Sequence, residues 1–190
     1  MLRDGFITGL ADNTNIDHQL YRPAVIYLNG EYWGIQNIRE KVNEHFLSSH
    51  HDIPSEHIDL LDIQGTNPEN IVHGTNIDYL NLLDYLNNND IEDPSVQSGI
   101  EGWIDINSFM QYQAFQIFID NRDWPGNNIK FWRDHRTSGK WRWILYDTDF
   151  GFGIWDPNAY TFNTLSFALT PNGPDWPNPP WSTYCLLYTS

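Results

Sequence analysis

The chemically suggestive residues of this sequence are concentrated between positions 120 and 151. Asp123 begins a loop that Pro125 and Gly126 interrupt, and Asn128 follows five positions later, directly before an alternating strand-like run. A carboxylate can accept or orient the proton of a substrate hydroxyl, and an amide oxygen is a hard ligand that suits magnesium. Asp123 and Asn128 are therefore the first candidates for a catalytic acidic residue and a metal ligand.

A second acidic pair stands at the end of the next strand-like run. Residues 141–146 are aromatic and β-branched, and Asp147 and Asp149 follow them. Residues two positions apart on an extended chain point to the same face, so both carboxylates can chelate one divalent ion. Ser138 and Gly139 supply a turn signal between the two runs, so we expect the runs to form a hairpin.

The order of these residues is that of the catalytic segment of protein kinases, in which H-R-D-x-x-x-x-N precedes D-F-G. Here the two parts read N-R-D through Asn128, and then Asp149-Phe150-Gly151. Asn121 stands where the kinase motif has histidine, and the intervening hairpin is somewhat long. A lone D-F-G is a weak indication, but two motifs in the right order at the ends of the expected elements favour a kinase-like site.

With these motifs the sequence resembles the spore-coat protein H (CotH) kinases, a family of atypical protein kinases. The resemblance covers about residues 3–165 and rests on four segments: R-P-A-V-I-Y-L-N-G-E-Y-W-G-I at 22–35, R-E-K at 39–41, N-R-D-W-P-G-N-N at 121–128, and K-W-R-W through D-T-D-F-G-F-G at 140–153. It implies that Asp123 is the catalytic acidic residue and that Asn128 is a metal ligand. The family pattern favours Asp147 as the further ligand and the kinase D-F-G pattern favours Asp149, so both stay candidates.

The resemblance also implies a fold, cofactors and partners. We expect an α+β, protein-kinase-like domain, mostly the C-terminal lobe with part of the N-terminal sheet, that uses ATP with Mg²⁺ or Mn²⁺. The expected reaction is phosphoryl transfer to Ser or Thr hydroxyls of a Ser-rich, basic protein. Family members are often bacterial and associated with spore coats or secreted and surface proteins, which predicts an extracellular or spore-surface location. No Gly-rich phosphate loop is visible, and we expect it upstream of Met1.

A second hairpin and a helix precede the catalytic segment. Residues 24–28 and 32–38 flank Asn29-Gly30, a strong hairpin signal, and a helix is expected over residues 42–50. Glu40 and Lys41 lie between them and are candidates for the charged pair that holds nucleotide phosphates in kinases. The alternative is an exposed charge cluster at a helix N-terminus, where an acidic residue is favourable.

Two longer helices are predicted. Residues 76–88 show apolar side chains at helical spacing, which predicts a core helix with these inward-facing residues: Ile77, Leu80, Leu82, Leu83, Tyr85 and Leu86. Asp105 caps a second helix through Ile119 that is apolar nearly all round, which indicates burial. This helix should anchor the loop of Asp123, with Asp120 in a structural role at its end. The remainder of residues 52–100 is Asn- and Asp-rich and carries no chemistry that we can name.

Composition limits the classes of function. The chain has 190 residues, 40% of them hydrophobic, which is enough for one domain with a core. A formal charge of −15 argues against nucleic acid or an anionic membrane as the main partner, and it favours solubility or a preference for cationic substrates. No apolar run is long enough to span a membrane, and the single Cys185 allows no disulfide framework.

The predicted domain covers residues 1–170. A tail rich in Pro, Asn and Trp follows over 171–190, and its last six residues resemble either a translated sequencing adaptor or a strand that is cut short. The abrupt start close to a family segment predicts that the chain is an N-terminally truncated fragment.

Two other functions remain as alternatives. One is a hydrolase that uses Asp123 with Asp147 or Asp149 on a glycosidic or ester bond. The other is a surface module with a structural calcium site and glycan contacts through five tryptophans: Trp124, Trp132, Trp141, Trp143 and Trp155. Packing in the core is the favoured interpretation of these tryptophans. Likewise, His50-His51 is read as solvent-exposed rather than as a zinc site.

Overall fold

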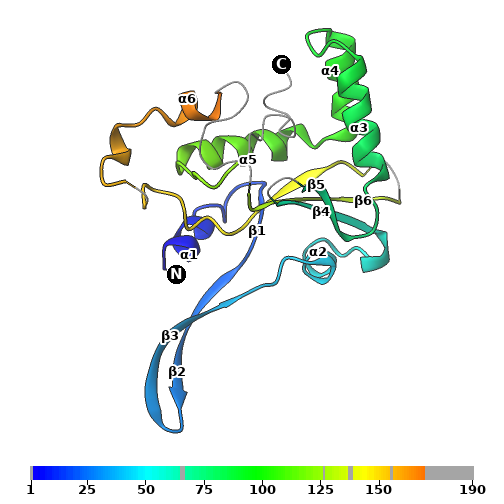
Figure 1. The fold of residues 1–190 in the computed structure, drawn as a ribbon. Coiled ribbons are helices and arrows are strands. Elements are labelled where there is room, and N and C mark those ends of the chain that lie inside the picture. The colour runs from blue at the N-terminus through cyan, green and yellow to red at the C-terminus, as the bar shows by residue number, and fades with distance from the viewer. Residues whose placement is uncertain (1, 65–66, 126, 137–138, 155, 170–190) are drawn as a thin grey trace.

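The structure is a computed structural model and describes residues 2–64, 67–125, 127–136, 139–154 and 156–169. These residues form a mixed five-stranded sheet, a separate two-stranded hairpin and six α-helices (Figure 1). The strands are β1 (Asp17–His18), β2 (Tyr21–Leu28), β3 (Glu31–Arg39), β4 (Ile58–Gln64), β5 (Asn67–His73), β6 (Ile129–Asp134) and β7 (Arg142–Leu145). The helices are α1 (Leu2–Gly9), α2 (Glu44–His51), α3 (Ile77–Asn88), α4 (Pro94–Trp103), α5 (Ile106–Phe118) and α6 (Thr164–Ala168), with short 3₁₀ turns η1 (Ser55–His57) and η2 (Ala159–Thr161). The predicted α+β class is confirmed, and the predicted tail of residues 171–190 lies outside the described residues.

The five-stranded sheet has the order β1-β7-β6-β4-β5. Strand β1 runs parallel to β7, and the other neighbours are antiparallel. The predicted hairpin is β6 and β7, with Phe131 opposite Trp143. Strand β4 lies between β6 and β5 and pairs with both. We predicted no chemistry or strands in the Asn- and Asp-rich stretch around it, but that stretch supplies strands β4 and β5 and helix α4.

Side chains alternate along each strand, so strands β4, β6 and β7 place apolar residues on both faces of the sheet, and helices bury both faces there. One face packs under α3 and α5, and the other packs against α2 (Figure 1). The first core includes Leu61, Phe131, Trp143, Leu82 and Tyr112. The second core includes Leu60, Trp132, Ile144, Phe46 and Leu47. A sheet held on both faces provides a rigid base for residues at the ends of its strands.

The β2–β3 hairpin is confirmed and extends away from the sheet (Figure 1). Asn29 and Gly30 both have positive φ, as the tight turn requires. Large apolar side chains on this hairpin are exposed: Val25, Tyr27, Leu28, Tyr32, Trp33, Ile35 and Ile38. The hairpin therefore has no core of its own among the described residues.

The three predicted helices are present as α2, α3 and α5, close to the predicted boundaries, but α3 and α5 are less buried than expected. Asp105 caps the N-terminus of α5, and its side chain accepts a hydrogen bond from the Ser108 backbone N–H. We expected this helix to be buried on nearly all sides, but one side is exposed: Met110 is 59% exposed and Phe118 is 68% exposed. In α3 the inward positions are Tyr79 and Leu82, with Leu83 and Leu86 packed beside them. Two residues assigned to its buried stripe, Ile77 and Leu80, are exposed, because the helix turns that side to solvent.

Asp17 connects four elements at one edge of the sheet. Its carboxylate accepts hydrogen bonds from Trp132 Nε1 and Arg142 Nε, each at 2.9 Å, and lies 3.0 Å from His51 Nε2. Burial opposes ionisation of Asp17, but the hydrogen bonds from His51 and Arg142 outweigh it and lower its pKa to about 2. The ionised carboxylate is therefore more stable in the folded protein than in the unfolded chain.

This depressed pKa predicts a pH-dependent contribution to stability. Because the folded pKa lies below the ordinary value of 3.8, the contribution is complete above pH 3.8 and is lost as pH falls through about 2. We expect Asp17→Asn to lower the free energy of unfolding by about 2 kcal/mol at pH 7, with the difference from wild type shrinking toward pH 2. Urea unfolding of both proteins across pH 2–7 measures this, with the exposed Glu92→Gln as a control. A difference that stays constant with pH would contradict the assignment.

Candidate active site at the ends of strands β6 and β7

The predicted site residues meet at one end of the β6–β7 hairpin. Lys130 pairs with Ile144 in antiparallel register, so Asn128, just before β6, and Asp147, just after β7, leave the sheet at the same end. The Asn128 side-chain N–H₂ lies 3.5 Å from the backbone oxygen of Asp147. The hairpin therefore brings the two halves of the motif together.

Two side-chain amides orient the carboxylate of Asp123. Asn127 Nδ2 and Asn128 Nδ2 both donate to Asp123 Oδ2, at 3.0 Å and 2.6 Å. Within the described part of the chain, Asp123 Oδ1 receives no hydrogen bond. That oxygen is available to a substrate hydroxyl, and the amide oxygen of Asn128 remains available to a cation.

A chain of buried and partly buried hydrogen bonds holds the loop that carries Asp123. Tyr112 Oη accepts from Gln116 Nε2 at 3.0 Å, and Gln116 Oε1 accepts from Asn121 Nδ2 at 2.9 Å. Asn121 Oδ1 in turn accepts from the Asp123 backbone N–H at 3.2 Å. The prediction that the 105–119 helix anchors this loop is confirmed, and Asn121, which replaces the kinase histidine, takes part in the anchor.

The predicted carboxylates interact electrostatically. Burial raises the pKa of Asp123, and the charge of Asp149 raises it further, against hydrogen bonds from Asn127 and Asn128. Burial also raises the pKa of Asp147, together with the charges of Asp149, Asp4 and Asp123. Carboxylates that raise one another's pKa repel each other when ionised, so a bound cation would stabilise their ionised forms.

The backbone that presents Asp147 and Asp149 differs from the predicted extended strand. Strand β7 ends at Leu145, Asp147 has a φ of 51°, and the Gly151 N–H bonds to the Thr148 oxygen at 3.0 Å in a turn. The period-two argument for a shared face is therefore wrong. The two carboxylates lie near each other because the chain turns between them, with Asp147 half-buried and Asp149 exposed.

Asp4 is a site residue that the sequence did not indicate. Its buried Oδ1 accepts hydrogen bonds from Thr148 N at 2.5 Å and from Thr148 Oγ1 at 2.9 Å. Its Oδ2 lies 2.8 Å from Arg39 Nη1 at the end of β3. Asp4 therefore ties α1 and the β2–β3 hairpin to the turn that carries Asp147 and Asp149.

The predicted nucleotide-binding pair is arranged differently from the kinase pattern. Glu40 accepts hydrogen bonds from the Leu20 backbone N–H at 3.0 Å and from His50 Nε2 at 2.9 Å. These contacts secure the base of the hairpin to α2. Lys41 is exposed. The charge of Arg39 opposes the rise in the pKa of Asp147.

Comparison with protein families identifies the family of this chain. The sequence matches the family described as CotH kinase protein over residues 1–187. This chain belongs to the CotH kinase family. The resemblance read from the motifs is thereby confirmed, and membership in this family implies a kinase. No curated protein matches the sequence.

A second cation of this CotH kinase lies beside the site. Lys130 Nζ is 3.9 Å from Asp62 Oδ2 and 4.7 Å from the centre of the Tyr146 ring. Burial lowers the pKa of Lys130, and the charge of Lys41 lowers it further, whereas Asp62 and Asp147 oppose this. Sequence reasoning missed Lys130, although its place two residues after Asn128 on an alternating strand is a signal that could have found it.

The oxygen ligands at this site suit a magnesium ion that is also bound by substrate phosphates, rather than a metal ion held by protein side chains alone. Among the residues that the structure describes, no group of three His, Cys, Asp or Glu side chains is arranged to hold a metal ion. Magnesium in phosphoryl-transfer sites is bound by one or two carboxylates plus substrate phosphates. Asp147, Asp149 and the Asn128 amide oxygen are the residues that would hold it, and the ion would neutralise phosphate charge.

Four of the five tryptophans are core residues, as the favoured interpretation predicted. Trp124, Trp132, Trp141 and Trp143 are buried, so their faces are not available to a sugar. Trp155 lies outside the described residues. No helix in the described ranges is both long enough and apolar enough to cross a membrane.

Proposed function

We propose that this CotH kinase transfers the γ-phosphoryl group of ATP to Ser or Thr hydroxyls of a protein. The observation that carries the proposal is the orientation of Asp123 by Asn127 and Asn128 beside Asp147. Phosphoryl transfer needs positioning and charge neutralisation more than covalent chemistry, and this arrangement supplies both. Magnesium or manganese with ATP would supply the electrophilic phosphorus.

In the proposed reaction Asp123 Oδ1 accepts the proton of the acceptor hydroxyl as its oxygen attacks the γ-phosphorus. The bond between that phosphorus and the β–γ bridging oxygen breaks, and ADP leaves. The raised pKa of Asp123 makes it a better proton acceptor than an ordinary aspartate, since a catalytic base works best with a pKa closer to the operating pH.

The proposed fold is the atypical kinase arrangement, with the β2–β3 hairpin as part of the N-terminal sheet and the five-stranded sheet with its helices as the C-terminal lobe. Glu40 and Lys41 are proposed to border the nucleotide, and the position of Lys130 between Asp62 and Asp147 supports a phosphate contact there. The expected acceptor is Ser-rich and basic, and the expected location is extracellular or on a cell or spore surface.

The proposal is tested by incubating the protein with ATP labelled at the γ-phosphate, magnesium or manganese, and a Ser-rich basic acceptor. We expect label on the acceptor that is stable in acid, lost in alkali and abolished by EDTA. Absence of label with every acceptor, together with no thermal shift on adding ATP, would overturn it. Turnover of a glycoside or ester without nucleotide would favour the hydrolase instead.

The two candidate metal ligands, Asp147 and Asp149, differ in burial and in the contacts of their neighbours. Asp147 is half-buried and next to Thr148, which Asp4 holds, whereas Asp149 is exposed. We expect Asp147→Asn to raise the magnesium concentration needed for half-maximal transfer by at least about 10-fold, and Asp149→Asn to raise it less. A magnesium titration of the transfer rate decides between them. A larger effect in Asp149→Asn would assign the main ligand to the D-F-G position.

A further inference from the structure

The turn that carries Asp147 and Asp149 contains two residues with a left-handed backbone conformation. Asp147 has a φ of 51°, and Phe152 has a φ of 49°. This conformation is unfavourable for residues other than glycine, so it persists where surrounding contacts hold it. The two residues lie on either side of Asp149. The contacts that hold them therefore set the positions of both candidate metal ligands.

Arg3, in the first turn of α1, holds the end of this turn that follows Asp149. Its Nη1 donates hydrogen bonds to the backbone oxygens of Gly151 and Phe152, at 2.8 Å and 3.0 Å. Consecutive carbonyl groups of an extended chain point in opposite directions, so this shared donor matches the bend at Phe152. A guanidinium suits this role because it is always charged and presents several donors in a fixed geometry.

Asp4, the next residue of α1, holds the other end of the turn. Its Oδ1 accepts hydrogen bonds from the backbone N–H and the hydroxyl of Thr148, which directly follows Asp147. The contacts of Asp4 are buried, whereas those of Arg3 are partly buried or exposed. Replacing Arg3 therefore disturbs the turn without breaking a buried ion pair.

Gly151 allows α1 and the end of α5 to approach the turn closely. A Cβ atom at this position would lie 3.0 Å from Ile7 Cδ1 and 3.1 Å from Thr148 O. The Phe152 backbone N–H donates to the oxygen of Ile119, directly after α5, at 2.6 Å. The glycine of the D-F-G motif is thus enclosed between α1 and the end of α5.

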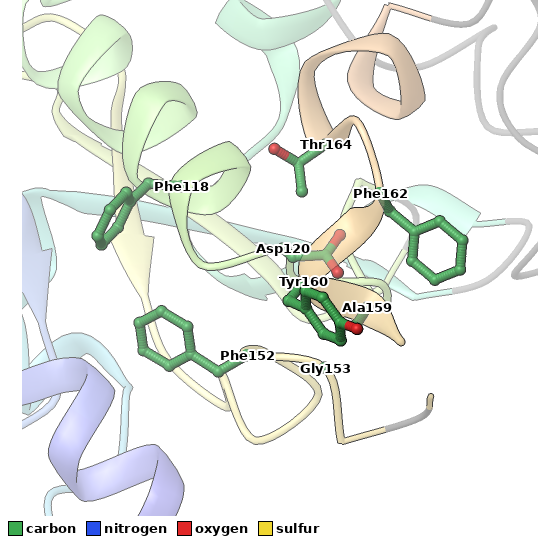
Figure 2. Close-up of a pocket in the computed structure, with 8 residues that line it drawn as sticks. All are labelled: Phe118, Asp120, Phe152, Gly153, Ala159, Tyr160, Phe162 and Thr164. Atoms are coloured by element: carbon green, nitrogen blue, oxygen red, sulfur yellow. The ribbon is translucent and has the colours of Figure 1, made fainter. Parts of the chain in front are cut away.

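The Phe152 side chain lies against both helices. Its ring centre is 6.4 Å from that of Phe6 in α1 and 6.0 Å from that of Phe118 in α5. Figure 2 shows the Phe152 ring beside Phe118, on the side of the turn that faces α1. Because Phe6 is 62% exposed and Phe118 is 68% exposed, these contacts bury little apolar surface. The rings alone are a weak restraint, and Arg3 supplies the polar contact that they lack.

We propose that Arg3 is a positioning residue that sets the affinity of this site for a divalent cation. By fixing Gly151 and Phe152 it fixes the path of the chain that leaves Asp149, and so the direction in which this carboxylate points. The hydrogen bonds of Arg3 are with backbone oxygens, so it acts on the carboxylate through the chain. The role of the cation in phosphoryl transfer rests on the proposed function.

The direction of the effect distinguishes positioning from charge. Removing the positive charge of Arg3 makes the surroundings of the site more negative, and by charge alone this strengthens cation binding. Loss of positioning acts in the opposite direction, because two backbone oxygens lose their donor and the turn can adopt other conformations. Weaker cation binding after loss of Arg3 is therefore the result that positioning predicts.

The test measures cation binding without turnover. Binding of Mn²⁺ in the presence of a non-hydrolysable ATP analogue is followed by the enhancement of water-proton relaxation. We expect Arg3→Met to weaken Mn²⁺ binding by about 10-fold or more, as is typical for residues that orient metal ligands. Arg3→Lys keeps the charge and a donor and should weaken binding less. Arg136→Met removes the same charge from an exposed pair with Asp134 and should leave Mn²⁺ binding unchanged.

Two further measurements separate positioning from a general loss of stability. Amide deuterium exchange at Phe152 should accelerate about 10-fold in Arg3→Met, with no change at Phe131 in β6. Asp17→Asn, which is expected to lower stability away from the turn, should keep the Mn²⁺ affinity of wild type under conditions where it is folded.

Unchanged or tighter Mn²⁺ binding in Arg3→Met would overturn the inference, and so would an equal loss in Asp17→Asn. If wild type transfers phosphoryl groups and Arg3→Met binds Mn²⁺ as wild type does, this inference alone is contradicted. Weaker binding in Arg3→Met, together with no transfer by wild type to any acceptor, would support the role of Arg3 and contradict the proposed function. Absence of Mn²⁺ binding by wild type would contradict both.

Discussion

Asp123→Asn is expected to reduce phosphoryl transfer by about 10²–10⁴-fold, the range that general-base groups contribute. The substitution keeps the shape of the side chain and an oxygen that can accept from Asn127 and Asn128, so the loop should keep its conformation. What it removes is the ability to accept the proton of the hydroxyl. The measurement is kcat for a Ser acceptor at saturating ATP and magnesium.

The matched control is Asp134→Asn, at the far end of β6. Its carboxylate pairs with Arg136 near the surface, at 2.6 Å, and it lies at the end of the strand opposite to Asn128. This variant should retain transfer within about twofold, because exposed ion pairs contribute little to stability. If Asp123→Asn also retained transfer to that extent, with circular dichroism unchanged, Asp123 would not be the proton acceptor.

Asp4→Ala is expected to have the largest effect on stability and also to disrupt the site. It leaves Arg39 without its buried partner and removes the acceptor of two hydrogen bonds from Thr148. Breaking a buried pair by removing one partner costs about 3–5 kcal/mol, and the partial exposure of Arg39 places the expectation near the lower value. Denaturant unfolding measures this loss.

A conservative variant separates stability from function at this position. Asp4→Asn retains an oxygen for Thr148 but removes the charge opposite Arg39, so we expect transfer to fall less than in Asp4→Ala at a temperature where both are folded. Asp12→Ala, which removes an exposed carboxylate paired with His18, is the control and should leave both stability and transfer nearly unchanged. Full stability in Asp4→Ala would show that its contacts do not hold the turn.

The parts of the fold that the sequence predicted are those set by local chemistry. The turn at Asn29-Gly30 and the cap at Asp105 act within a few residues, and both predicted elements are present. Strand β4 was missed because Asp59 and Asp62 interrupt its apolar pattern. In the sheet these residues stand opposite Arg133 and Lys130 of β6, which compensate their charge, and partners so distant in the sequence leave no local signal.

The candidate site shows the same division. Asp123 and Asn128 were found because their spacing follows a motif, and the structure places a hydrogen bond between them. Asp4 was not found, because its role depends on a contact with Thr148, 144 residues later in the chain. The turn at Asp147 was read as extended because an aspartate with positive φ looks, in sequence, like any other residue after a strand.

The site is linked through Arg39 and Asp4 to the projecting β2–β3 hairpin, which has no core of its own among the described residues. A two-stranded ribbon without a core is only marginally stable, so its backbone amides should exchange with deuterium sooner than those of β4, β6 and β7. Because β3 ends in Arg39, a displacement of the hairpin would change the ion pair of Arg39 with Asp4. Through the hydrogen bonds of Asp4 with Thr148, it would also move the turn that carries Asp147. A partner that binds this hairpin would therefore act on the turn that carries Asp147 and Asp149 without contacting that turn.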